Sequence, residues 1–151
     1  MKAVSRGLMV VALAAAVAAC DGSPTAGPAL VAANDGGAAQ SPGVLTFASQ
    51  PSQTEQSPQT AGGGLAGIDF TGSLVTGTPC YTVSATHATE GSDVTVTVTG
   101  TRTGDICAQV VTYHNYTGRV SALLPGTYSF TVIHRVGANT TTAFSGTVTV
   151  Q

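Results

Sequence analysis

The sequence predicts an all-β fold, a two-sheet antiparallel sandwich, over residues 65–151 of the 151-residue chain. Short runs of alternating apolar and Thr or Ser residues follow one another there. Turn-forming residues recur about every ten positions, and no helical period of comparable length appears after residue 20. The run at 93–101 is the clearest, because Val94, Val96 and Val98 alternate with threonines. One face of that strand should therefore pack on a core while the other meets water.

Seven strands are expected in this domain, separated by turns rich in Gly, Pro, Asn and Asp. In the last two strands, aromatic and valine side chains should point inward and hydroxyl side chains outward. The domain is long enough for one small core. The predicted strands are residues 67–74, 80–88, 93–101, 106–115, 119–124, 127–136 and 141–150, and the inward side chains of the last two are Tyr128, Phe130, Val132, Phe144, Val148 and Val150.

The turn before the sixth predicted strand has the sequence Leu124, Pro125, Gly126, Thr127, Tyr128. A Leu, a Pro-Gly turn and a Tyr that opens the next-to-last strand resemble the tyrosine corner of immunoglobulin and fibronectin type III domains. The resemblance implies an immunoglobulin-like sandwich in which the Tyr128 hydroxyl reaches back to a backbone group across the turn. The chain has no Trp and no cysteine in this strand, so it departs from the antibody pattern.

The first nineteen residues have the features of an export signal. Lys2 and Arg6 provide a positive segment, and residues 8–17 contain only Leu, Met, Val and Ala. This run is too short to cross about 30 Å of hydrocarbon as a permanent helix. We therefore expect residues 1–19 to be removed as a signal peptide.

The sequence that ends this signal, Val17, Ala18, Ala19 and Cys20, resembles the lipobox of bacterial lipoproteins. The resemblance implies cleavage before Cys20, a diacylglycerol thioether on its sulfur and an acyl chain on its new amino group. Two or three such chains hold a protein on a membrane durably. The domain would then lie in the periplasm or at the cell surface, anchored to the cell membrane or the outer membrane. The alternatives are an ordinary signal peptide cut near Ala19, with Cys20 unmodified, and an uncleaved anchor.

Residues 20–64 are rich in Ala, Gly, Ser, Pro and Gln, with Leu45 and Phe47 as the main large apolar residues. Such a composition cannot bury enough apolar surface to offset the entropy of ordering, so we predict a disordered tether. Two interpretations of residues 44–47 remain open. They are a chance apolar patch in the tether, or a short strand that docks on the edge of the domain or on a partner.

Two further cysteines, Cys80 and Cys107, remain if Cys20 carries lipid. Thiols outside the cytoplasm pair, and both residues open strands that should begin at the same end of the sandwich. We predict a disulfide between them. Two free thiols or a metal-binding pair are the alternatives.

The three histidines, His87, His114 and His134, lie near the ends of predicted strands that run in the same direction. They are therefore expected at the end of the sandwich opposite the cysteines. Three imidazoles there would suit zinc or copper, but solvated histidines at strand ends are the simpler expectation. Apart from the lipid on Cys20, no cofactor is expected.

Few other residues indicate chemistry. Removal of residues 1–19 leaves three arginines, no lysine and seven acidic residues, which argues against nucleic-acid binding. Nucleophile-elbow, zinc-protease and phosphate-loop motifs are missing from the sequence, so we expect no enzyme activity. Two minor possibilities remain, a calcium-binding loop cluster and a sugar or protein contact on an exposed turn. The first would use Glu90, Asp93 and Asp105, and the second Tyr113 and Tyr116.

The favoured function is a membrane-anchored, non-catalytic sandwich that binds a protein, a glycan or another component of the cell envelope. A metal-binding or enzymatic protein that uses the histidines is one alternative. An accessory structural subunit of an envelope complex is another.

Overall fold

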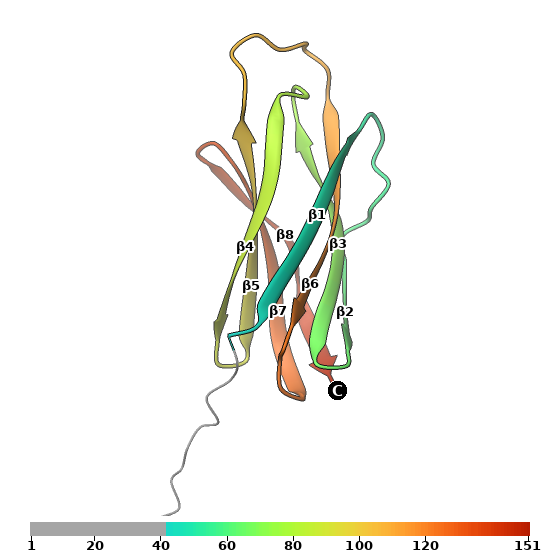
Figure 1. Cartoon of the computed structure of the whole chain (residues 1–151), viewed down its shortest axis with the longest axis vertical. Coiled ribbons are helices and arrows are strands. Elements are labelled where there is room, and N and C mark those ends of the chain that lie inside the picture. The colour runs from blue at the N-terminus through green and yellow to red at the C-terminus, as the bar shows by residue number, and fades with distance from the viewer. Residues whose placement is uncertain (1–41) are drawn as a thin grey trace, which may run out of the picture. The chain divides into compact units, whose positions relative to one another are not determined.

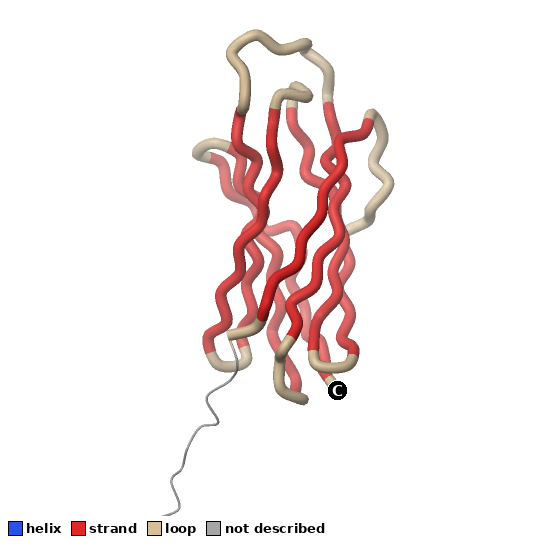
Figure 2. The backbone as a smooth tube through the Cα atoms, viewed as in Figure 1, coloured by secondary structure: helices blue, strands red, loops and turns tan. Residues whose placement is uncertain are grey.

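The computed structural model describes residues 42–151, which form a β-sandwich of eight strands in two sheets (Figures 1 and 2). No helix occurs in this range, and so none that is long and apolar enough to cross a membrane. The predicted signal peptide and the lipidation site Cys20 lie outside the described residues. The strands are β1 (Val44–Ser52), β2 (Thr60–Gly64), β3 (Gly67–Thr76), β4 (Tyr81–Glu90), β5 (Asp93–Arg102), β6 (Thr112–Ser121), β7 (Gly126–Val136) and β8 (Asn139–Val150).

Each sheet has four strands, in the orders β1-β6-β3-β2 and β4-β5-β7-β8. The first sheet is antiparallel throughout, but β5 and β7 pair in parallel. The prediction of a wholly antiparallel sandwich is therefore wrong at this pair. After β5 the chain crosses to the first sheet, descends as β6 and crosses back, so β7 runs in the same direction as β5 (Figure 1).

The predicted count of seven strands is also wrong. Five strands lie close to their predicted positions, whereas the predicted strands at 106–115 and 119–124 are replaced by the single strand β6. Residues 103–111 form a loop. Gly118 lies within β6 rather than in a turn, and the Phe70 ring packs against it: a Cβ atom there would come within 2.2 Å of the Phe70 side chain.

The remaining difference in the strand count comes from residues 44–64, where the tether prediction is wrong. The strand interpretation of residues 44–47 is confirmed, because β1 pairs with β6 along its whole length. Leu45 and Phe47 pack against the core, and the Phe47 ring lies 5.5 Å from that of Tyr116. The residues of β2 pair with β3, and a Cβ atom on Gly63 would lie 1.8 Å from the carbonyl oxygen of Thr149. This glycine therefore permits close contact between β2 and β8 rather than flexibility.

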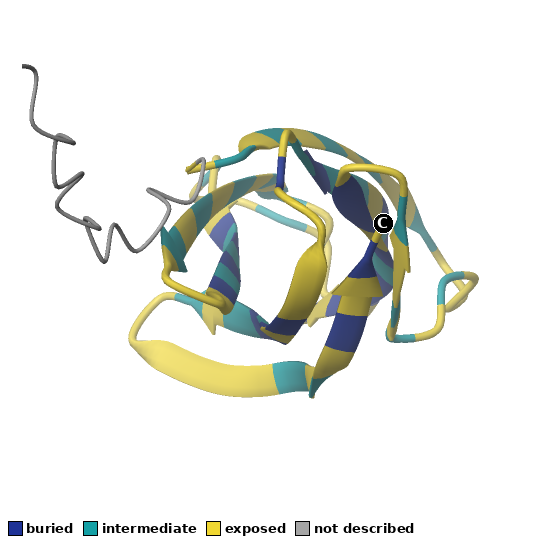
Figure 3. Cartoon of the chain, turned by 90° about the horizontal axis from the view of Figure 1, so that it is seen from below, coloured by how far each residue is buried: buried dark blue, intermediate teal, exposed yellow. Residues whose placement is uncertain are grey.

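The core lies between the two sheets, where the buried faces of the strands meet (Figure 3). Val94, Val96 and Val98 are fully buried, as the alternation in their strand predicted. The inward side chains predicted for the last two strands are also buried, except that Phe144 is only partly so. The other large members of the core are Ile68, Phe70, Leu74, Tyr116, Val120 and Leu123.

The predicted tyrosine corner is present at the turn between β6 and β7. The Tyr128 hydroxyl donates a hydrogen bond of 2.8 Å to the carbonyl oxygen of Leu124, and Tyr128 is buried. Leu124 contributes only this carbonyl, since its side chain is 43% exposed and the neighbouring Leu123 enters the core instead.

The two ends of the sandwich differ. One end carries the β3–β4 and β5–β6 loops, and there Cys80 and Cys107 form the predicted disulfide, with Cα atoms 6.0 Å apart. We call this end the disulfide pole. At the opposite end, the entry pole, the first described residue, Pro42, joins the sandwich (Figure 1). Its carbonyl oxygen accepts hydrogen bonds from His87 Nε2 (2.8 Å) and Thr89 Oγ1 (3.1 Å).

Candidate functional site

The loop of residues 103–111 at the disulfide pole exposes aliphatic side chains. Ile106 is 98% exposed, and Val110 and Val111 are 41% and 54% exposed. The disulfide ties the loop to the start of β4. Arg102 also restrains it, by donating hydrogen bonds to the carbonyl oxygens of Gly104 (2.8 Å) and Asp105 (3.0 Å). The apolar side chains are therefore displayed on a braced loop.

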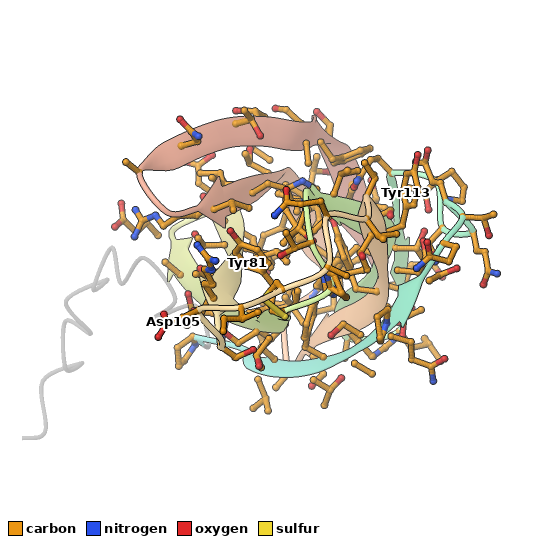
Figure 4. All side chains as sticks on the ribbon, turned by 90° about the horizontal axis from the view of Figure 1, so that it is seen from above. Tyr81, Asp105 and Tyr113 are labelled. Carbon is orange, nitrogen blue, oxygen red and sulfur yellow. A yellow bond between two sulfur atoms is a disulfide. The ribbon has the colours of Figure 1, made fainter. Side chains whose placement is uncertain are left out.

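Among the described residues, no pair of aromatic rings forms a platform beside these side chains. Viewed onto the disulfide pole, Tyr81 lies near Asp105 of the loop, whereas Tyr113 lies on the far side (Figure 4). Tyr81 and Tyr113 are both half-buried. The loop thus offers an aliphatic contact surface, of the kind that another protein surface can cover.

A second candidate is a crevice of about 460 Å³ on the flank of the sandwich, between the end of β3 and the start of β8. It lies just beyond the point where β2 begins, at Thr60, which pairs with Thr71 of β3. Pro58 lies two residues earlier, and proline cannot donate a backbone hydrogen bond to a neighbouring strand. The crevice is lined by Gln59, Ser73, Leu74, Val75, Thr76, Gly77, His134, Val136, Asn139, Thr141 and Ala143.

A chain of hydrogen bonds runs from the edge of β3 into this crevice. Gln59 Nε2 donates to the carbonyl oxygen of Ser73 (3.1 Å), and the Tyr116 hydroxyl donates to Gln59 Oε1 (2.9 Å). The same hydroxyl oxygen lies 2.8 Å from His134 Nε2. Because the hydroxyl has one proton and gives it to Gln59, the network assigns the proton of this bond to His134 Nε2. Gly72 leaves room for the chain, since a Cβ there would lie 2.2 Å from Gln59 Oε1.

Burial keeps these groups neutral. It raises the pKa of Tyr116 to about 12, although the hydrogen bond with Gln59 acts in the opposite direction. It lowers the pKa values of His134 and His114, because an imidazolium loses solvation inside the protein. His114 Nε2 lies 3.0 Å from the Thr76 hydroxyl, which itself donates to the carbonyl oxygen of Thr78. A neutral imidazole that donates to Thr76 fits this arrangement.

The three histidines do not gather at one end of the sandwich, so that expectation is wrong. His114 is near the start of β6 and His134 near the end of β7, both toward the disulfide pole, while His87 binds Pro42 at the entry pole. The error follows from the merged strand, because β6 begins at Thr112 and places His114 at its start rather than its end. Within residues 42–151, no three His, Cys, Asp or Glu side chains form a group that could hold a metal ion.

Neither the acidic loop cluster nor the pair of tyrosines on an exposed turn forms as predicted within the described residues. Glu90 and Asp93 flank the β4–β5 turn and pair with each other, whereas Asp105 lies in the loop at the other pole. Tyr116 is not on an exposed turn, because it is 1% exposed and lies inside the sandwich. Gln59 and Ser73, which the sequence did not single out, take part in the crevice instead. No local pattern marks them, since their contacts are with residues distant in the chain.

Comparison with known families shows where this domain belongs. The model of the ORF11 beta-sandwich domain matches residues 71–150, more than half of the chain. The chain belongs to this family. The ORF11 beta-sandwich match begins at Thr71, the β3 residue that pairs with the first residue of β2. It includes the 103–111 loop and every residue that lines the crevice except Gln59. Neither the curated proteins nor the solved structures contain a significant match.

Proposed function

We propose that this protein is a membrane-anchored bacterial lipoprotein whose sandwich is a non-catalytic binding module for a protein of the cell envelope. The observation that carries the proposal is the braced 103–111 loop, which exposes Ile106 almost completely. An aliphatic residue held on a restrained loop loses little conformational entropy on binding, so its burial contributes efficiently to affinity.

The placement of the loop supports an anchored binding module. The resemblance to a lipobox puts the lipid on Cys20, and Pro42 joins the sandwich at the entry pole. The 103–111 loop occupies the opposite pole. The chain that leads from the proposed anchor therefore joins the sandwich at the pole opposite this loop, so the attachment itself does not cover the loop.

The chemistry of the loop favours a protein over a glycan. Binding sites for sugars commonly stack the sugar on aromatic rings, and here Tyr81 and Tyr113 lie apart from each other at the pole (Figure 4). Aliphatic side chains on a loop that also exposes the charged residues Arg102 and Asp105 suit an apolar pocket with a polar rim on a partner.

The anchor is tested by intact-mass measurement and fractionation of the mature protein expressed in its native host. We expect a mature N-terminus at Cys20 that carries diacylglycerol and an acyl chain, and recovery in the membrane fraction. The Cys20→Ser variant should lose the lipid. A bare thiol at Cys20 in the wild-type protein would contradict the proposal.

The binding surface is tested by photo-crosslinking in intact cells, with the crosslinker at Val110. We expect a protein adduct that disappears in Ile106→Asp and persists in Ser84→Asp, a matched change at an exposed position of β4. An adduct that forms equally well in Ile106→Asp would argue against the loop. An adduct removed by glycosidases would replace the protein partner with a glycan.

A further inference from the structure

The crevice lies beside a length of β3 that, among residues 42–151, has a neighbouring strand on one side only. The last residue of β3 that pairs with β2 is Thr71, whereas pairing with β6 continues to Thr76. β2 is shorter than β3, so it covers only part of this edge of β3 (Figure 1). An unpaired edge of this kind presents backbone donors and acceptors that another strand can use.

The side chain of Gln59 shows which backbone groups of β3 face the open edge. Its Nε2 donates to the Ser73 carbonyl from the same side on which β2 pairs with residues 67–71 of β3. Alternate residues of an antiparallel strand direct both their N–H and C=O groups to the same edge. Val75, two residues further on, therefore directs its backbone groups into the same track, and its side chain is 51% exposed.

The opposite wall of the crevice is set by a β-bulge. The pairing of β7 with β8 shifts between Val132 and Ile133, so the residue opposite His134 is Thr141. The bulge reverses the inward alternation along the first part of β8, and Asn139, Thr141 and Ala143 line the crevice as a result.

The lining has no formal charge. It contains no Lys, Arg, Asp or Glu, and burial keeps the imidazole of His134 neutral. Amide, hydroxyl and imidazole groups alternate there with aliphatic side chains. Within residues 42–151 the buried Ser73 hydroxyl finds no hydrogen-bond partner, so hydrogen-bonding capacity remains next to this edge of β3.

We propose that the crevice binds an extended, uncharged segment of another polypeptide, which pairs with the backbone of β3 at Val75, next to the Ser73 carbonyl that Gln59 already occupies. Such strand addition derives affinity from backbone hydrogen bonds and selectivity from pockets for alternate side chains. Asn139, Thr141 and Ala143 form the wall that the segment's inward side chains meet, which selects small or β-branched residues. The lining contains no Phe, Tyr or Trp ring on which a sugar could stack. This site is independent of the 103–111 loop.

The test uses the full-length protein in detergent and a phage-displayed library of seven-residue peptides. The best peptide is synthesised, and its binding is measured by fluorescence polarisation. We expect Thr141→Trp, which fills the crevice, to weaken binding at least tenfold. Thr142→Trp is the matched control, because Thr142 is the adjacent exposed residue and pairs with Ile133 on the other face of β8.

Two further changes test whether the peptide forms backbone hydrogen bonds with β3. The Val75→Pro variant removes the N–H group of the free edge, and proline is tolerated at an edge strand. It should weaken binding at least tenfold, with folding checked by circular dichroism. Methylation of alternate amide nitrogens in the peptide should do the same against the wild-type protein, which needs no variant to fold. Equal binding of the methylated peptide, or of the Thr141→Trp variant, would overturn the proposal, as would binding of maltohexaose but of no peptide from the library.

Discussion

On the flank of the sandwich where β2 and β3 face β8, two halves are closed in different ways. The lower half is the one toward the entry pole, and the upper half is the one toward the disulfide pole. In the lower half, β2 lies against β8, where Gly63 lets the backbones touch and Gln151 N–H bonds to the Gly64 carbonyl at 3.0 Å. In the upper half β2 is missing, and the side chains of Gln59, Tyr116 and His134 span the gap. Backbone contact therefore seals one half, while a polar network leaves a crevice in the other.

The largest expected effect is in the closed half. Gly63→Ala should lower the free energy of unfolding by about 3 kcal/mol or more, because the new Cβ atom would overlap the Thr149 carbonyl. Gly62→Ala is the control, since a Cβ atom there meets nothing within 4 Å. Urea unfolding of both variants measures the difference. Equal stability would show that the seam between β2 and β8 contributes little.

The disulfide braces the upper half at the pole. Replacement of Cys80 and Cys107 by serine should lower the free energy of unfolding by about 3–4 kcal/mol, because the unfolded chain gains the freedom of a loop with a sequence separation of 27. Denaturant titration measures the loss, and reduction of the wild-type protein should reproduce it. A loss below about 1 kcal/mol would show that the remaining contacts hold this pole together.

The polar network should contribute less. Tyr116→Phe removes the hydroxyl that joins Gln59 to His134 and should cost about 1–3 kcal/mol, since both partners lose a buried hydrogen bond. Tyr113→Phe, at the neighbouring half-buried tyrosine of β6, should change stability little. Thermal melting of the two variants compares them. Equal melting temperatures would show that the hydrogen bonds of the Tyr116 hydroxyl do not stabilise the upper half.

The smallest effect is a dependence of stability on pH. Burial lowers the pKa values of His114 and His134 in the folded protein, so the unfolded chain binds protons first as the pH falls below about 6.5. Stability should be constant above about pH 7 and decrease between pH 6.5 and the lowered values. Melting temperatures from pH 8 to 5 measure this slope, and His134→Gln should reduce it. A slope unchanged in both His134→Gln and His114→Asn would contradict the assignment to these residues.

The hydrophobic alternation was a reliable guide where strands bury one complete face. Val94, Val96 and Val98 were predicted inward and are fully buried, and the Tyr128 hydroxyl bonds back across its turn. These features depend on neighbours in the chain, so their pattern is visible in the sequence. The disulfide was predictable as well, because only two cysteines follow Cys20.

Composition misled the prediction for residues 44–64. Two inward residues, Leu45 and Phe47, are sufficient for a strand that covers one edge of an existing sheet, although they are too few to form a core alone. The glycines of β2 suggested flexibility when read without their neighbours. Their function in the fold depends on Thr149, which lies far away in the sequence.

The sequence by itself determined the all-β class, the position of most strands, the inward residues of the core and the cysteine pair, because each follows from local periodicity or from counting. Tertiary structure decided the parallel pairing of β5 with β7, the separation of the histidines and the crevice between Gln59 and Thr141. These features arise where residues distant in the chain meet. No periodicity encodes such contacts, because they depend on which strand lies beside which.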